Sequence, residues 1–163
     1  MKSMRTMTRG RLSGFTAVEL MVTLAILAIL LGIAVPSFSS FTENQRLRAA
    51  STDLRTDLTF ARSEALKRNQ TVSIQRRSAA GWQSGWVVAV QSSGQELRVR
   101  NDIGRGVSLT GAADAVTFNG SGRVASPAGN VQFALSASST SSSGRCVVLD
   151  PSGMSLAYAE PCS

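Results

Sequence analysis

Residues 15 to 35 form a nearly unbroken apolar run, with one carboxylate, Glu19, just inside its start. As a helix the run is about 30 Å long, which matches the hydrocarbon core of a bilayer. A buried helix of a soluble protein is one alternative, but a helix apolar on every side would need a larger protein around it. A secretory signal is another, although no A-x-A-like cleavage site follows the run. The pattern therefore predicts a membrane-spanning helix over residues 15–36.

Residues 37–69 continue the helical pattern with a different character, because apolar side chains occupy a single stripe. The stripe has helical spacing and consists of Leu47, Leu54, Leu58, Ala61 and Ala65. Asp53, Asp57 and Glu64 alternate with basic residues, which is typical of a solvated face. We expect one long helix from about residue 15 to about residue 69, ending in a cap at Asn69.

From residue 70 onward the period of apolar residues changes to two. Seven short runs are separated by Gly, Ser, Asn or Pro, which predicts antiparallel strands in a sandwich or a curled pair of sheets. Residues 136–144 are serine-rich and predict an exposed loop. The fold class expected is therefore α+β, with a long N-terminal helix on a β-rich head over residues 70–163.

The chain has 163 residues, enough for one domain with a sizeable core. Its net charge is +7, but the first fourteen residues contain four bases and no acid and so carry +4 of it. The rest of the chain has 13 bases against 10 acids, or +3, so the high pI does not by itself indicate nucleic-acid binding. The positive-inside bias predicts a cytoplasmic N-terminus and a head on the other side of the membrane.

The segment "RGRLSGFTAVELMVTLAILAILLGIAVPSF" resembles the class III signal of type IV pilins and type II secretion pseudopilins. In that family a prepilin peptidase cuts after the glycine of the signal and methylates the new N-terminal residue. The resemblance implies that residues 1–14 are a leader, that cleavage falls between Gly14 and Phe15, and that Phe15 is methylated. The glutamate and proline of the family pattern correspond to Glu19 and Pro36.

A lone charge at the membrane centre costs about 2.5–3.5 kcal/mol or more. Near the start of the helix Glu19 is less costly, since it lies close to the interface and to the positive end of the helix dipole. In a filament it can pair with the amine of Phe15 of a neighbouring subunit, and the alternative is an interfacial glutamate without a partner. Pro36 either weakens a turn that must leave the bilayer or marks the exit from the membrane.

The second half of the chain sharpens this resemblance. "STDLRTDLTFARSEALKRNQTVSI" and "GWQSGWVVAV" are similar to the GspH/FimT type of minor pilins and pseudopilins, with the FimU/FimT minor pilins of type IV pili as the nearest group. The resemblance implies a protein that helps to prime a pilus and lies near its tip, in a Gram-negative bacterium. The partners implied are other minor and major pilins, the prepilin peptidase, the inner membrane and its assembly platform. A minor pseudopilin of type II secretion is an alternative.

Cys146 and Cys162 are the two cysteines of the chain, sixteen residues apart. In an oxidising periplasm such a pair is most simply a disulfide, worth roughly 3 kcal/mol by loop entropy. Two free thiols are the alternative, natural only for a cytosolic head. A disulfide also fits the C-terminal staple common in pilins.

Nothing in the sequence favours an enzyme, a metal site or a cofactor. The chain has no histidine, its acids are scattered, and its G-x-G fragments lack the context of a nucleotide-binding loop. We therefore expect a structural protein without cofactors.

DNA binding is the alternative function, and it would make the chain a binding protein rather than a structural subunit. Some FimT-like pilins bind DNA through a G-R-x-R motif near the C-terminus, but here the corresponding residues 153–156 read G-M-S-L and lack both arginines. Dispersed surface arginines are the interpretation we favour over a basic track. The candidate contacts that remain are Arg76, Arg77, Arg98, Arg100 and Arg123.

Overall fold

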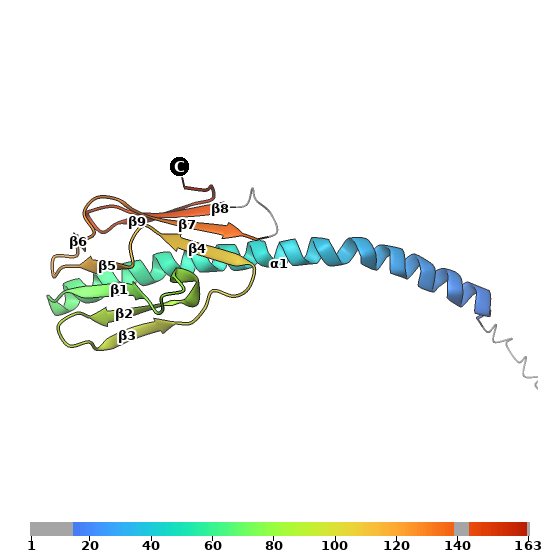
Figure 1. Ribbon diagram of the computed structural model, residues 1–163, viewed down its shortest axis with the longest axis horizontal. Coiled ribbons are helices and arrows are strands. Elements are labelled where there is room, and N and C mark those ends of the chain that lie inside the picture. The colour runs from blue at the N-terminus through green and yellow to red at the C-terminus, as the bar shows by residue number, and fades with distance from the viewer. Residues whose placement is uncertain (1–14, 139–143, 163) are drawn as a thin grey trace, which may run out of the picture. The chain divides into compact units, whose positions relative to one another are not determined.

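The computed structural model describes residues 15–138 and 144–162 (Figure 1). It contains one long helix, α1 (Ala17–Arg68), followed by strands and a short 3-10 helix, η1 (Trp82–Ser84). The chain divides into two compact units, residues 1–38 and 39–163, which are described separately below. Gly14, the rest of the expected leader and most of the serine-rich loop lie outside the described residues.

The first unit contains the N-terminal part of α1. This part is long and apolar enough to cross a membrane, and none of the apolar stretch is buried. The helix assignment continues through residue 36, so Pro36 does not end the helix. The helix predicted from the sequence thus exists over the expected length.

The head contains two antiparallel sheets. The five-stranded sheet has the order β3-β2-β1-β5-β6, formed by β1 (Val72–Arg76), β2 (Trp86–Val90), β3 (Glu96–Arg100), β5 (Ala115–Phe118) and β6 (Val124–Ser126). The four-stranded sheet has the order β4-β7-β8-β9, formed by β4 (Val107–Gly111), β7 (Val131–Ala137), β8 (Gly144–Leu149) and β9 (Ser155–Tyr158). The seven strands expected from the sequence are all present, and β4 and β6 were missed.

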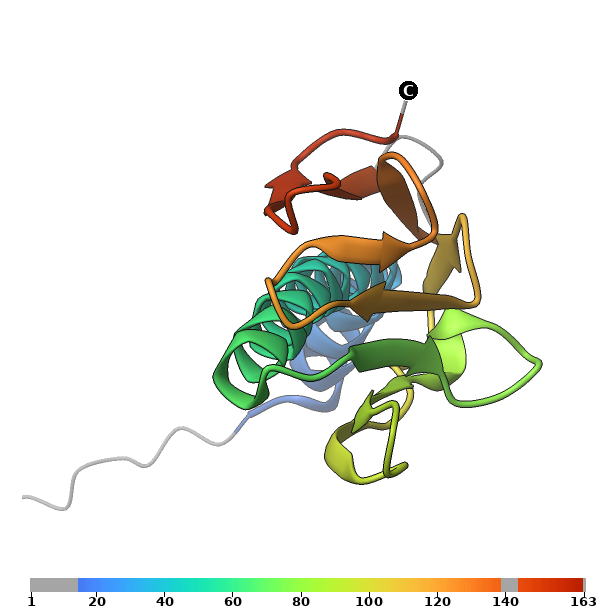
Figure 2. The ribbon, with the colours of Figure 1, turned by 90° about the vertical axis from the view of Figure 1, so that its left-hand side faces the viewer.

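One hydrophobic core joins the head part of α1 to both sheets, which lie beside the helix when it is viewed along its axis (Figure 2). The predicted stripe is confirmed, since Leu54, Leu58, Ala61 and Ala65 are fully buried and Leu47 nearly so. Side chains from the two sheets meet these residues, among them Ile74 and Phe118 from the first sheet and Phe133 and Leu149 from the second.

The end of α1 is capped as the sequence predicts. Asn69 has a positive φ of 50°, its N–H donates to the carbonyl of Leu66, and the N–H of Gln70 donates to the carbonyl of Ala65. This is the Schellman arrangement, which reverses the chain from the helix into β1. The turn therefore fixes where the first strand begins beside the helix.

Gly85, just before β2, is required by the packing of the first sheet. Its φ is +95°, and a Cβ atom there would lie 2.1 Å from the carbonyl oxygen of Arg100. The G-W pair at Gly85 and Trp86 therefore has a physical basis, because only glycine allows β2 and the end of β3 to approach so closely.

Candidate assembly surfaces

The start of α1 shows how the chain positions Glu19. Thr16 precedes the first helical residue, and its Oγ1 accepts a hydrogen bond from the backbone N–H of Glu19 at 3.2 Å. This is the N-cap contact of a Thr-x-x-Glu start. The Glu19 carboxylate itself makes no hydrogen bond or ion pair with the described residues, and Phe15 beside it is 76% exposed. Glu19, expected to act in assembly, and Phe15, expected to become the methylated N-terminus, are thus both accessible at one end of the helix.

In the head, a carboxylate predicted to face solvent is instead buried. Asp57 is fully buried on the helix face that packs against the first sheet, so the solvated position expected for it is wrong. Its Oδ2 accepts a hydrogen bond from Trp86 Nε1 at 2.9 Å, and its Oδ1 pairs with Arg98 Nη1 at 2.6 Å. A buried carboxylate needs such donors, because an unpaired buried charge is costly. Asp57 therefore ties the helix to β2 and β3.

Most of the arginines considered for DNA contact have partners within the head. Arg98 lies 3.9 Å above the ring of Phe60 as well as pairing with Asp57. Arg100 pairs with Asp53 at 3.2 Å, and Arg76 pairs with Asp114 at 2.7 Å.

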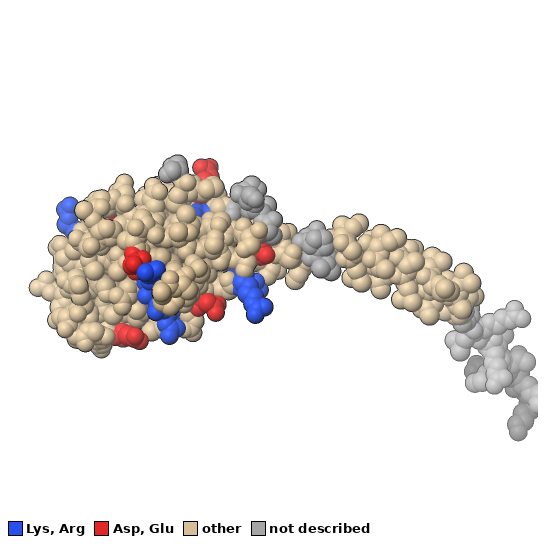
Figure 3. Space-filling view, in the orientation of Figure 1, with Lys and Arg blue, Asp and Glu red and all other residues tan. Residues whose placement is uncertain are grey.

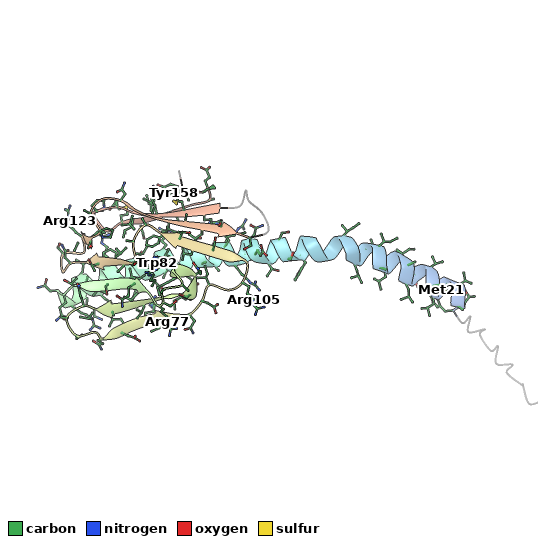
Figure 4. The ribbon with its side chains drawn as sticks, in the orientation of Figure 1. Met21, Arg77, Trp82, Arg105, Arg123 and Tyr158 are labelled. Atoms are coloured by element: carbon green, nitrogen blue, oxygen red, sulfur yellow. A yellow bond between two sulfur atoms is a disulfide. The ribbon has the colours of Figure 1, made fainter. Side chains whose placement is uncertain are left out.

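The other two DNA candidates lie far from each other. Arg77 donates to the side-chain oxygen of Asn101, whereas Arg123 is exposed in the turn after β5. Figure 4 shows Arg77 and Arg123 at separate points of the head. On the face shown in Figure 3, blue and red side chains of the head are interspersed. The structure does not bring the five arginines together.

The position of the absent G-R-x-R motif is a packed turn rather than a free surface. Gly153 is buried, its carbonyl accepts from Arg62 Nη1 at 3.3 Å, and a Cβ atom there would lie 2.3 Å from the carbonyl oxygen of Gly122. The β8–β9 turn is thus held between the helix and the β5–β6 turn.

The β5–β6 turn and the β8–β9 turn are also held by the same set of three hydrogen bonds, which was not predicted from the sequence. The Asp150 side-chain oxygen accepts from the N–H groups of Ser152 and Met154 and from the Ser152 hydroxyl. Asn119 Oδ1 accepts the corresponding three bonds, from Ser121 and Arg123, in the neighbouring turn. The hydrogen bond from the Ser152 hydroxyl holds the pKa of Asp150 below its ordinary value. The similar sequences of the two turns, "NGSG" and "DPSG", could have predicted that they are held in the same way.

Cys146 and Cys162 form a disulfide, with their Cα atoms 4.9 Å apart. The bond attaches the C-terminal segment to β8, on the side of the second sheet that faces away from the core. The pairing expected from the sequence is therefore present.

The first part of the helix is apolar and is not covered by the rest of the chain, and the second part packs on a head of two antiparallel sheets. These features define a pilin-like subunit. Comparison with known proteins gives the family. The family described as Type II transport protein GspH matches residues 50–153, and the chain belongs to this family.

Individual relatives agree with this assignment. The chain is 30% identical over 117 residues to a type IV major alpha-pilin of Moraxella bovis, covering 72% of this chain and 69% of that protein. The type IV minor pilin FimU of Pseudomonas aeruginosa has a similar structure, with a TM-score of 0.62 and 26% identity over 74% of this chain and 92% of that one. A second crystal form of FimU gives a TM-score of 0.60 at 24% identity, over 69% and 92% of the two chains.

These relationships confirm the GspH/FimT type expected from the sequence and the α+β pilin fold. The protein is a minor pilin with a role in the assembly of a pilus or pseudopilus. Its family and fold are structural, and it associates with other pilins in a filament.

Proposed function

We propose that this chain is a minor pilin that helps to prime a type IV pilus, after a prepilin peptidase has cut between Gly14 and Phe15 and methylated Phe15. The observation that carries the proposal is the first part of α1, whose apolar side chains have no cover within the chain. Leu20, Leu24 and Leu27, for example, are each half-exposed or more. Such a surface must be covered by lipid before assembly and by other subunits afterwards.

Glu19 is the residue that supports a role of the helix in assembly, because a helix that only anchors the chain in the membrane needs no carboxylate. Its backbone N–H is already satisfied by Thr16, while its carboxylate has no partner among the described residues. Cleavage would leave the amine of Phe15 close to the start of the helix, as a positive charge opposite in sign to the Glu19 carboxylate. We infer that the carboxylate pairs with the Phe15 amine of a neighbouring subunit, since two charges that the apolar surroundings disfavour are stabilised when paired.

In the same proposal the N-terminus lies in the cytoplasm and the head in the periplasm before assembly. The inner-membrane platform then inserts the subunit into the filament, near its tip. The four bases of the leader support this orientation through the positive-inside bias. A type II secretion pseudopilin is the second candidate, supported by the description of the family to which the chain belongs.

The test replaces Glu19 in the full-length protein, expressed in cells that make pili. Glu19→Ala should abolish recovery of the subunit in sheared filaments while its amount in the membrane stays unchanged, because only the intersubunit charge pair is lost. Glu96→Ala, which removes an exposed carboxylate of the head, is the matched control and should assemble normally.

Normal recovery of the Glu19→Ala protein in filaments would contradict the assembly role. Deleting the gene and measuring pili and type II secretion in parallel distinguishes the two candidates. Loss of pili with intact secretion supports the pilus, and the reverse result supports the pseudopilus.

A further inference from the structure

A hollow of about 600 Å³ lies on the head beside the outer face of α1. The helix contributes Arg55, Thr56 and Thr59 to its lining, β3 contributes Arg98, and β8 contributes Arg145. The hollow is open along the helix between the two sheets, because β3 ends the order of the first sheet and β9 that of the second. With Ala157 of β9, the hollow presents residues from four elements to a single occupant.

The charges around this hollow are unbalanced. No carboxylate lines it, although three guanidinium groups do. Arg98 is neutralised from behind by Asp57. Arg55 and Arg145 form no ion pair among the described residues, and Arg55 uses only its Nε, which donates to the carbonyl of Ser155 at 3.3 Å. Two positive charges, one from the helix and one from the second sheet, thus remain uncompensated in one concave site.

Most of the hydroxyl groups that line the hollow donate within the helix. Thr56 donates to the carbonyl of Thr52, and Thr59 donates to that of Arg55, both within the helix. Apart from the hydroxyl of Thr52, which has no partner among the described residues, the free donors are therefore those of the arginines. An occupant must supply acceptors, and carboxylates match guanidinium groups best because they allow paired, charge-assisted hydrogen bonds.

We propose that this hollow is a docking site for an acidic segment of a different pilin subunit. The inference rests on the proposed function, and it adds the partner's chemistry: an extended stretch of chain with at least two carboxylates close in sequence. One carboxylate meets Arg55 and the other meets Arg145, while the methyl group of Ala157 contacts the backbone between them.

A second copy of this chain does not offer such a segment. Its closest acids in sequence, Asp53 and Asp57, are both paired with arginines of β3. The remaining acids are isolated from one another along the chain. The contact is therefore heterologous, between unlike subunits.

A nucleic acid fits the site less well than an acidic peptide. Single strands bind through aromatic rings on which bases stack, but the ring of Phe60 is covered by Arg98. A duplex needs a continuous basic track, whereas the neighbouring Arg100 is paired with Asp53.

The binding test uses the full-length chain in detergent micelles and a fluorescent peptide with two glutamates separated by one alanine. Its glutamine counterpart is the matched probe. Anisotropy should show binding of the glutamate peptide only, weakened by salt. Arg145→Gln and Arg55→Gln should each lower the affinity about tenfold, the effect of losing one charge-assisted contact. Arg123→Gln, at an exposed arginine that does not line the hollow, should leave the affinity unchanged.

Equal binding of the two peptides, or an equal loss with Arg123→Gln, would overturn the proposal. So would displacement of the peptide by a single-stranded oligonucleotide at equal concentration. Thermal unfolding of Arg145→Gln at the same temperature as the parent protein excludes a folding defect. Because the peptide measurement needs no filament, a chain that binds the peptide but never enters filaments would contradict the proposed function alone.

A photo-crosslinking amino acid at Thr56 then identifies the partner in cells, with Thr110 on the exposed face of β4 as the control position. A product between Thr56 and a different pilin, lost with Arg145→Gln, supports the site. A product that contains two copies of this chain, or none specific to Thr56, overturns it.

Discussion

The two parts of α1 have opposite relationships with the rest of the chain. In residues 17–33 the large apolar side chains are exposed all round, so that Leu27 is 50% and Leu24 56% accessible. In the head part, a single apolar stripe is buried, with Leu54 and Leu58 at 0%. One continuous helix thus contains a segment that its own chain covers and a segment that it leaves uncovered.

The difference shows that the two segments are stabilised by different partners. Core packing holds the head part, where a narrow stripe is enough because polar residues face solvent. The first part has more apolar surface than a soluble monomer tolerates, and it needs lipid or other subunits. Substitutions in the first part should therefore change assembly, and substitutions in the second should change the stability of the head.

The largest expected effect on the head comes from Asp57→Ala. Removing this carboxylate leaves the Arg98 and Trp86 donors without their acceptor, which should lower the free energy of unfolding by about 4 kcal/mol. Asp114→Ala is the matched variant, because it breaks an ion pair with Arg76 in which Asp114 is 75% exposed. That change should cost no more than about 1 kcal/mol.

Urea unfolding of the full chain in micelles, followed by tryptophan fluorescence, measures both variants. Similar losses for Asp57→Ala and Asp114→Ala would mean that the buried contact does not hold the helix to the sheet. Asp57→Asn, which keeps an oxygen for Trp86, should fall between the two.

A direct comparison of the two parts of the helix uses the same substitution in each. Leu58→Ala creates a cavity in the core and should lower the free energy of unfolding of the head by about 3 kcal/mol. Leu27→Ala removes a half-exposed side chain and should leave that value unchanged. The same fluorescence titration measures both. An equal effect of the two variants would show that the first part of α1 contributes to the core of the head.

Much of this arrangement could be predicted because it depends on local periodicity. The helix extent, its buried stripe and seven strands follow from apolar residues at periods of 3.6 and two. Strand β4 was missed although its residues, V-S-L-T-G, alternate apolar and polar side chains, because this short run directly follows a glycine-rich segment. Strand β6 has only three residues, too few to show an alternation.

The position of Asp57 was predicted wrongly for a different reason. Its charge suggested solvent, but it lies three residues after Leu54 and four before Ala61, which is the spacing of the buried stripe. That position could have been noticed from the sequence. Its partners on β2 and β3 could not, because they depend on how the sheet packs on the helix. The hollow around Arg145 depends on tertiary packing in the same way.

The smallest expected effect concerns the response of the head to acid. The pKa of Asp150 is lowered from 3.8, first by the hydrogen bond from Ser152, and that of Glu64 is lowered from 4.5, first by the one from Arg68. Since the folded state favours the charged form, each group stabilises the head above its ordinary pKa, and this contribution is lost as the pH falls through the lowered value. The head should therefore lose stability below about pH 4, whereas the apolar part of α1 beyond Glu19 contains no titratable group.

Asp150→Asn isolates one of these contributions. The amide oxygen of Asn119 accepts the same three hydrogen bonds in the neighbouring turn, so the asparagine variant should keep the turn and remain folded at neutral pH. Its urea midpoint should fall less than that of the parent protein between neutral pH and about pH 3, because the charge that acid would remove is already absent. Glu96→Gln is the control, since its carboxylate forms no side-chain hydrogen bond among the described residues, and its midpoint should follow the parent. A parallel decline of all three proteins would place the acid response of the head in other carboxylates.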